Sequence, residues 1–236
     1  MNTTRMAYSD IKVIGFDADD TLWVNESFFR EAEQQFANLL SPYETINKID
    51  QELFKKEMDN LTLYGYGIKG FMFSMTESAI EISNGNISNQ SIKQILSIGK
   101  DMLNKPVELL DGIEEVLQNL STKYRLILCT KGDLLDQERK LKKSNLTQYF
   151  HHVEVMSEKK KEDYTKVLSH LDIAPREFLM VGNSLKSDIL PLIDIGSQAI
   201  HIPFHTTWQH EKVDSNKLDS NQYLTLDSVQ KLLDHL

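Results

Sequence analysis

The chain has 236 residues, with 26 lysines and arginines against 35 aspartates and glutamates, so its formal net charge is −9. Such an acidic chain offers no basic surface to a polyanion, which argues against a nucleic-acid partner and against an anionic membrane surface. Hydrophobic residues make up 40% of the sequence, which is typical of a globular protein and excludes an intrinsically disordered one.

A single cysteine is present, so no disulfide can form within the chain. Cys129 lies in the apolar run Leu126–Cys129 and is expected to be a buried, unreactive thiol. No apolar stretch reaches the roughly 18 residues that span a bilayer, and Met1–Asp10 lacks the apolar centre of a signal peptide. The expected location is therefore the cytoplasm.

The first predicted strand is Lys12–Phe16, a short apolar run with β-branched residues. It leads directly into the acidic loop Asp17-Ala18-Asp19-Asp20-Thr21. Carboxylates this close together repel one another unless a cation lies among them, and a hard divalent ion such as Mg²⁺ prefers oxygen ligands. The alternative is that these side chains cap the start of a helix.

Residues 25–105 show helical spacing of apolar residues and no convincing strand. The spacing predicts helices from Asn25 to Pro42, around Ile46–Phe54, over Phe71–Ile82 and from Ser88 to Pro106. The glycine-rich stretch Tyr64–Gly70 interrupts the pattern between the second and third helices. The sequence therefore predicts a helical insert over residues 23–105, with residues 1–22 and 106–236 forming one α/β core.

Strands and helices alternate again after Asp111. The predicted elements are the helix Ile113–Leu120, the strand Arg125–Cys129, a helix at 133–143, the strand His152–Val155, the helix Tyr164–Leu171, the strands Phe178–Val181 and Ala199–Ile202, and a closing helix Ser228–Leu236. This alternation predicts a Rossmann-like, doubly wound parallel sheet with helices on both faces.

Polar side chains follow four of the predicted strands, at Asp17 with Asp19, at Thr130, at Lys159, and at Asn183 with Asp188. Parallel strands bring these positions to one edge of the sheet, where open α/β folds bind their ligands. Thr130, followed by Lys131 and Gly132, can bind an anion through its hydroxyl and backbone N–H groups, although a simple turn also explains it. One lysine of the run Lys159–Lys161 can supply a fixed positive charge for a phosphoryl group.

Together these residues resemble the haloacid dehalogenase superfamily, in its phosphatase branch. The resemblance rests on four motifs in family order: Val13–Thr21 as four apolar residues and Asp-x-Asp-x-Thr, Leu126–Thr130, Lys159, and Gly182–Asp188 as Gly-Asp-Ser-x-x-x-Asp. The helical insert is similar to the superfamily's C1-type cap. Asn183 departs from the pattern, since many relatives carry Asp there, and it is a doubtful metal ligand.

The resemblance implies a Mg²⁺-dependent phosphomonoester hydrolase acting on a small phosphorylated metabolite. Asp17 would attack phosphorus to form an aspartyl-phosphate, and Asp19 would protonate the leaving oxygen and then activate water. The Asp17 carboxylate, the Asp19 backbone carbonyl and Asp188 would hold the metal. The phosphate would be bound by Thr130, Lys131 and Lys159. The namesake dehalogenases lack an acid at the position of Asp19 and need no metal, so Asp19 favours phosphate chemistry.

The cap is expected to determine substrate specificity, and the candidates for lining its cleft are Trp23, Asn25, Tyr64, Tyr66 and Lys69. Packing alone explains these aromatic residues equally well. A zinc site at His205 and His210 is disfavoured because no cysteine or nearby acid supports it. A phosphotransferase or phosphomutase of the same superfamily, and a non-enzymatic phosphoryl-accepting or ligand-binding module, are the alternatives. No oligomeric state is predicted.

Overall fold

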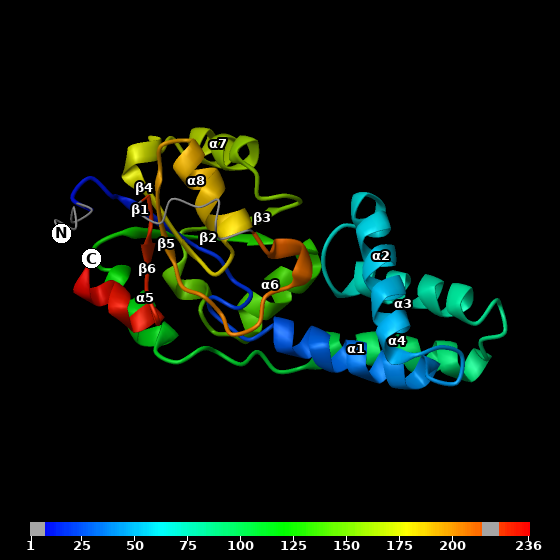
Figure 1. Ribbon diagram of the computed structural model, residues 1–236. Helices are drawn as coiled ribbons and strands as arrows, with labels where there is room; N and C mark the ends of the chain where they lie inside the picture. The colour runs from blue at the N-terminus through cyan, green and yellow to red at the C-terminus, as the bar shows by residue number, and fades with distance from the viewer. Residues whose placement is uncertain (1–7, 214–221) are drawn as a thin grey trace. The chain divides into compact units, whose positions relative to one another are not determined.

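The computed structural model in Figure 1 describes residues 8–213 and 222–236. The described chain forms two compact units. The first unit contains the residues up to Val24, Glu108–Lys131 and the residues from Leu141 onward, and it holds the sheet. The second unit contains Asn25–Val107 and Gly132–Lys140, and it is helical. No helix among the described residues is long and apolar enough to cross a bilayer.

The first unit is built on a parallel sheet with the strand order β3-β2-β1-β4-β5-β6. The strands are β1 (Val13–Phe16), β2 (Arg125–Lys131), β3 (His152–Met156), β4 (Phe178–Gly182), β5 (Gln198–His201) and β6 (Leu224–Thr225). The order reverses between β1 and β4, which is the arrangement of a doubly wound fold. The predicted Rossmann-like sheet is therefore confirmed. The strand β6 was not predicted, because two residues give no periodic pattern.

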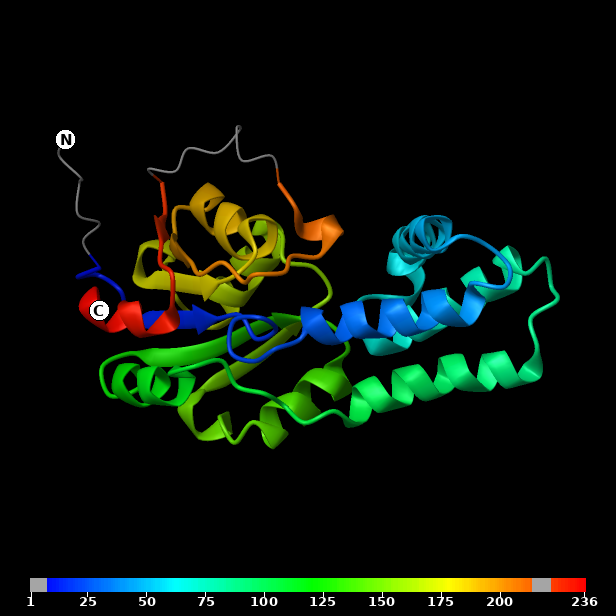
Figure 2. The ribbon, with the colours of Figure 1, turned by 60° about the horizontal axis from the view of Figure 1, so that its bottom comes forward.

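Helices cover both faces of this sheet, as Figures 1 and 2 show. On one face lie α7 (Lys161–His170) and α8 (Leu190–Asp194), and on the other lie α5 (Ile113–Leu120) and the 3₁₀ helix Val229–Asp234. Since both faces are covered, the central strands are apolar along their whole length and buried.

Two elements of the first unit differ from their predictions. The strand β2 continues through Thr130 and Lys131, because these residues pair with Val155 and Met156 of β3, so the predicted loop begins only at Gly132. The closing segment is a 3₁₀ helix and not the predicted α-helix. Its buried residues Val229 and Leu232 are three apart and share one face of a helix with three residues per turn.

The second unit consists mainly of α1 (Glu26–Leu40), α2 (Ile46–Tyr64), α3 (Ile68–Ile82) and α4 (Asn89–Asn104). The helix α6 (Leu134–Lys143) begins in this unit and ends in the first. The four helices enclose a core of their own, in which Phe36, Leu40, Ile49, Met75 and Ile95 are fully buried.

Two details at the helix ends of this unit differ from the predictions. The break between α2 and α3 is shorter than the predicted Tyr64–Gly70, because only Gly65–Gly67 leave the helical conformation. Gly65 and Gly67 have φ angles of 69° and 104°, which are costly for other residues. Asn25 stands at the start of α1, but its side chain does not cap the helix and instead accepts a hydrogen bond from Lys140 Nζ at 3.3 Å.

Candidate active site

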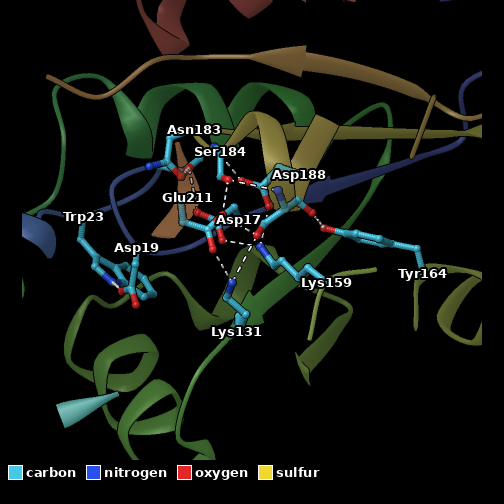
Figure 3. A network of polar contacts seen from close by, with 12 residues as sticks. Asp17, Asp19, Trp23, Lys131, Lys159, Tyr164, Asn183, Ser184, Asp188 and Glu211 are labelled. Atoms are coloured by element: carbon cyan, nitrogen blue, oxygen red, sulfur yellow. Dashed lines mark hydrogen bonds and ion pairs between the residues drawn. The ribbon is translucent and has the colours of Figure 1, made fainter. Parts of the chain in front are cut away.

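Three side chains from three strand ends of the first unit point toward one another in Figure 3. Lys159 Nζ donates to Asp17 Oδ1 at 2.5 Å and to Asp188 Oδ1 at 2.7 Å. The side chains of Lys159, Asp17 and Asp188 are 2%, 9% and 1% exposed, so the cluster is almost completely withdrawn from water. The structure thus brings together two buried carboxylates and one ammonium group.

The charges of this cluster do not balance. Burial raises the pKa of Asp17 to about 7, and the neighbouring Asp188 carboxylate adds to this rise while Lys159 opposes it. Burial disfavours the charged form of Lys159, but the two carboxylates outweigh this effect and raise its pKa. Lys159 therefore stays protonated, and its single positive charge is shared by two carboxylates.

Asp17 is held by the backbone of β1 and by the turn that follows it. Its N–H donates to Val181 O at 2.9 Å, which extends the pairing of β1 with β4 by one residue. Thr21 Oγ1 donates to Asp17 Oδ2 at 2.9 Å and lies 3.3 Å from Asn183 Oδ1. The Thr of the first motif thus fixes one oxygen of Asp17, while Lys159 contacts the other.

Asp188 is held by the turn that follows β4. Ser184 N donates to Asp188 Oδ2 at 3.0 Å, and Ser184 Oγ accepts from Ser187 N at 3.0 Å. A Cβ atom at Gly182 would lie 2.4 Å from Asp188 Cγ, so only glycine allows the carboxylate to approach the strand end this closely. The glycine of the fourth motif is explained by this contact.

Asp19 does not join the cluster of Asp17, although it is only two residues away. Its Oδ1 accepts a hydrogen bond from Trp23 Nε1 at 2.6 Å, and Figure 3 shows this pair to one side of the Lys159 contacts. In the described residues, no three side chains of His, Cys, Asp or Glu are placed to hold one metal ion. The side chains of Asp17 and Asp19 therefore have different partners, and Asp19 can reach a cation bound at Asp17 only through its backbone carbonyl.

The oxygen atoms of the cluster are suitable ligands for a hard divalent cation. The Asp17 and Asp188 carboxylates share one ammonium group, and the amide oxygen of Asn183 contacts the same Thr21 hydroxyl as Asp17. All of these donors are oxygens, and the cluster has more negative than positive charge. Mg²⁺ suits such a donor set better than a softer transition metal does.

Thr130 carries a buried polar atom that the fold does not satisfy. Thr130 is 1% exposed, and its Oγ1 has no hydrogen-bond partner among residues 8–213 and 222–236. Leaving a buried hydroxyl unpaired costs about 1–3 kcal/mol, which is unusual in a folded protein unless a ligand completes the bond. Thr130 lies at the carboxyl end of β2, next to β1 in the sheet.

Lys131, the next residue, has a partner that the sequence did not indicate. Its Nζ pairs with Glu211 Oε1 at 2.6 Å and donates to Ser187 Oγ at 3.2 Å. Glu211 Oε2 accepts from Ser184 Oγ at 2.5 Å and from Ser187 Oγ at 2.6 Å. Burial alone would raise the pKa of Glu211, but Lys131 and the two serines outweigh it and lower this pKa to about 2.

Of the three lysines Lys159–Lys161, only Lys159 is buried, and it is the one that reaches the carboxylates. Cys129 is fully buried as expected, and burial raises the pKa of its thiol to about 12, so it is not a nucleophile at neutral pH. Trp23 does not line a cleft: it is buried in the first unit.

The remaining specificity candidates lie in the second unit. The hydroxyl of Tyr64 donates to Glu77 Oε1 at 2.8 Å, and its ring packs against Phe73 with the centroids 5.0 Å apart. Lys69 forms an ion pair with Asp133 Oδ2 at 2.8 Å, and Tyr66 is half-buried. Tyr64 and Lys69 are exposed, so they remain accessible to a ligand.

Comparisons with known proteins agree on one family. Residues 11–196 match the model of the haloacid dehalogenase-like hydrolases. The N-acylneuraminate-9-phosphatase of Mus musculus is 24% identical over 205 residues, which cover 82% of this chain and 83% of that protein. A haloacid dehalogenase-like family hydrolase from Xanthomonas campestris has a similar structure, with 36% identity, a TM-score of 0.84 and coverage of 94% of this chain and 88% of that one.

A further solved structure shows the same fold with a metal. The putative hydrolase YfnB from Bacillus subtilis, solved bound to magnesium, has a TM-score of 0.64 to this chain at 16% identity. The match covers 95% of this chain and 97% of that one. At this identity the likeness extends to the fold alone.

Proposed function

Because the chain belongs to the haloacid dehalogenase-like hydrolase family, we propose that it is a Mg²⁺-dependent phosphomonoesterase that acts on a small phosphorylated metabolite through an aspartyl-phosphate on Asp17. The observation that carries this proposal is the convergence of Asp17, Asp188 and Lys159. The unpaired Thr130 hydroxyl at the end of the adjacent strand supports it.

In the first step, a carboxylate oxygen of Asp17 attacks phosphorus in line with the leaving group. The bond between phosphorus and the ester oxygen breaks, and that oxygen takes the proton of the Asp19 carboxyl group. In the second step, water attacks the aspartyl-phosphate and gives a proton to the Asp19 carboxylate. The bond between phosphorus and Asp17 breaks, inorganic phosphate leaves, and Asp19 is again protonated.

We assign the cation to Asp17, Asp188 and the backbone carbonyl of Asp19. When bound, Mg²⁺ would neutralise charge between an anionic nucleophile and an anionic phosphate, which otherwise repel each other. Asn183 can contribute an amide oxygen but is already engaged with Thr21, so it is the weaker candidate. Thr21 would keep one Asp17 oxygen in place while the other reacts.

We assign the phosphate oxygens to the Thr130 hydroxyl and the Lys159 ammonium. Thr130 is a buried donor without an acceptor in the part of the chain that the structure describes, and Lys159 carries a charge in a site withdrawn from water, where electrostatic interactions are strongest. Lys131 is the less favoured phosphate ligand, because its charge is already paired with Glu211.

Phosphate chemistry is favoured over carbon–halogen cleavage by Asp19, which the proposed mechanism needs as an acid and a base. The phosphatase names of the curated relatives support the same assignment. We further propose that the second unit is the cap and that Tyr64, Tyr66 and Lys69 contribute to substrate selection from there.

The test is the variant Asp17→Asn, assayed for phosphate release from p-nitrophenyl phosphate with Mg²⁺ and with EDTA. Loss of the nucleophile should lower the rate by a factor of about 10³ or more, as for other members of catalytic groups that act as a unit. Asp10→Asn, at an exposed carboxylate before β1, should change nothing. Full activity of Asp17→Asn would rule out the proposed nucleophile, and transfer of phosphate to an added alcohol would indicate a phosphotransferase.

A further inference from the structure

The indole of Trp23 is buried beside the proposed acid–base residue. Its side chain is among the largest fully buried ones in the described chain, at 1% exposure, and its Nε1 donates to Asp19 Oδ1 at 2.6 Å. Asp19 itself is half-buried. Figure 3 shows the two side chains facing each other, apart from the contacts of Asp17 with Lys159.

The backbone around Trp23 is fixed on both sides. Asp20 N donates to Trp23 O at 2.7 Å, and Leu22 N donates to Ala18 O at 2.8 Å, which closes the turn. On the other side Leu110 N donates to Leu22 O at 2.9 Å, next to the bridge that joins Trp23 to Leu109. Because its backbone is held in this way, the buried indole presents its N–H in a fixed position. The hydrogen bond from this N–H orients the Asp19 carboxylate.

We propose that Trp23 is a positioning residue that decides which oxygen of Asp19 exchanges the proton. The inference rests on the proposed function, in which Asp19 is the acid and the base. The indole N–H is only a donor, so Oδ1 must accept from it and cannot carry the carboxyl proton toward it. In a protonated carboxyl the carbonyl oxygen accepts more strongly than the hydroxyl oxygen, so the contact at Oδ1 favours the proton on Oδ2, and this oxygen gives it to the leaving group.

The consequence depends on the leaving group. When the ester bond breaks, its electron pair goes to the leaving oxygen, which takes the proton from Asp19 Oδ2. A p-nitrophenolate is stable as an anion and needs this proton little, whereas a phenolate without the nitro group is more basic and needs it more. Misorientation of the Asp19 carboxyl group should therefore slow the cleavage of phenyl phosphate more than the cleavage of p-nitrophenyl phosphate.

The variant Trp23→Phe keeps a buried aromatic ring and removes the N–H. The quantity to measure is kcat/KM, which covers the steps up to cleavage of the ester and excludes the later hydrolysis. For Trp23→Phe we expect kcat/KM to fall about 10-fold or more with phenyl phosphate and less than about 3-fold with p-nitrophenyl phosphate. General acid–base catalysis typically accelerates a reaction by about 10²–10⁴-fold, so a 10-fold loss corresponds to part of this effect. An equal loss for both esters, or none, would overturn the inference.

Two further variants separate positioning from packing. Trp208→Phe removes the other tryptophan of the chain and should leave the ratio of the two kcat/KM values unchanged. Replacement of Trp23 by 3-benzothienylalanine keeps the size of the ring and lacks the N–H, so it should reproduce the Trp23→Phe ratio even if the phenylalanine variant folds poorly. A wild-type ratio in the benzothienyl variant would show that the ring, and not its N–H, matters.

A spectroscopic measurement tests the contact without any turnover. The chain has two tryptophans, so Trp208→Phe leaves Trp23 as the sole indole fluorophore. In that background Asp19→Ala should shift the Trp23 emission, and Asp10→Ala should not. If no variant hydrolyses any ester but the emission shifts, the proposed function fails while the contact stands. If the enzyme is active but the emission does not shift, the inference fails and the function stands.

Discussion

At the scale of single residues, most polar groups of the site have hydrogen-bond partners within the protein, and one buried hydroxyl does not. Asp17, Asp188 and Glu211 each accept at least two hydrogen bonds or ion pairs from neighbouring side chains or backbone. Among the described residues the Thr130 hydroxyl has no partner, although Thr130 is as buried as Asp188. An unpaired buried hydroxyl lowers the stability of the free protein, and a bound ligand that accepts its hydrogen bond offsets this cost.

The variant Thr130→Val should therefore separate stability from binding. Removing an unpaired hydroxyl while keeping the shape should leave the free energy of unfolding unchanged or raise it by about 1 kcal/mol. The inhibition constant of inorganic phosphate should rise by about 10-fold or more, because a hydrogen bond to a charged group is lost. Urea denaturation and inhibition kinetics measure the two effects.

Thr165→Val is the matched control, since its hydroxyl donates to Lys161 O at 2.7 Å on the surface of α7. It should leave phosphate inhibition unchanged. A Thr130→Val protein that is destabilised by several kcal/mol, with unchanged phosphate inhibition, would show that the hydroxyl has a partner within the protein.

Glu211 makes the stability of the fold depend on pH. Its pKa is lowered from 4.5 to about 2, so the ionised carboxylate stabilises the folded state above pH 4.5. This stabilisation, about 3 kcal/mol in magnitude, is lost as the pH falls from 4.5 toward 2. The free energy of unfolding of Glu211→Gln should therefore lie below that of the wild type at pH 7, and the difference should shrink as the pH falls from 4.5 toward 2. A difference that is constant over this range would contradict the assignment.

At the scale of elements, the end of β4 and the turn after it act as one support for Asp188. Gly182 ends the strand, Ser184 starts the turn, and both define where the carboxylate lies. The variant Gly182→Ala should displace Asp188, lower the free energy of unfolding by about 1–3 kcal/mol and weaken Mg²⁺ binding by about 10-fold. Titration calorimetry with Mg²⁺ measures the affinity without turnover.

Gly85→Ala is the control for a general loss of stability. Gly85 has a φ angle of 77° and lies in the second unit with no atom near its missing Cβ. Alanine there should cost about 1 kcal/mol through backbone strain and leave Mg²⁺ affinity unchanged. If both variants reduced the Mg²⁺ affinity alike, the effect of Gly182→Ala would come from a general loss of stability and not from displacement of the Asp188 carboxylate.

The elements also show why part of the site could be predicted and part could not. Asp17, Lys159 and Asp188 follow strands whose parallel pairing follows from the alternation of strands and helices, so their convergence could be expected. Glu211 lies on the short 3₁₀ turn Gln209–Glu211, which has no periodic pattern and no motif to mark it. The direction of the Asp19 side chain depends on the turn to Trp23, which local sequence does not determine.

At the scale of the whole molecule, each unit has a hydrophobic core of its own. Met75 is fully buried among the helices of the second unit, and Met180 is fully buried in β4 of the first. Met75→Ala should cost about 2–5 kcal/mol and increase hydrogen exchange of the α1–α4 amides, with the strands still protected.

Met180→Ala is the matched change in the first unit and should give the opposite pattern. Its methionine is equally buried, so the loss of stability should be similar, but the strands should lose protection first. If either variant exposed the amides of both units together, the two units would unfold as one.

The strands that pair in the centre of the sheet are far apart in the sequence, and this separation has a consequence for folding during synthesis. The strand β1 (Val13–Phe16) leaves the ribosome before both of its partners in the sheet, which begin only at Arg125 and Phe178. The helices α1–α4 emerge between them and can bury their apolar faces against one another first. Asp17, the proposed nucleophile, is thus translated well before Lys159 and Asp188, and its site is complete only when both have reached it.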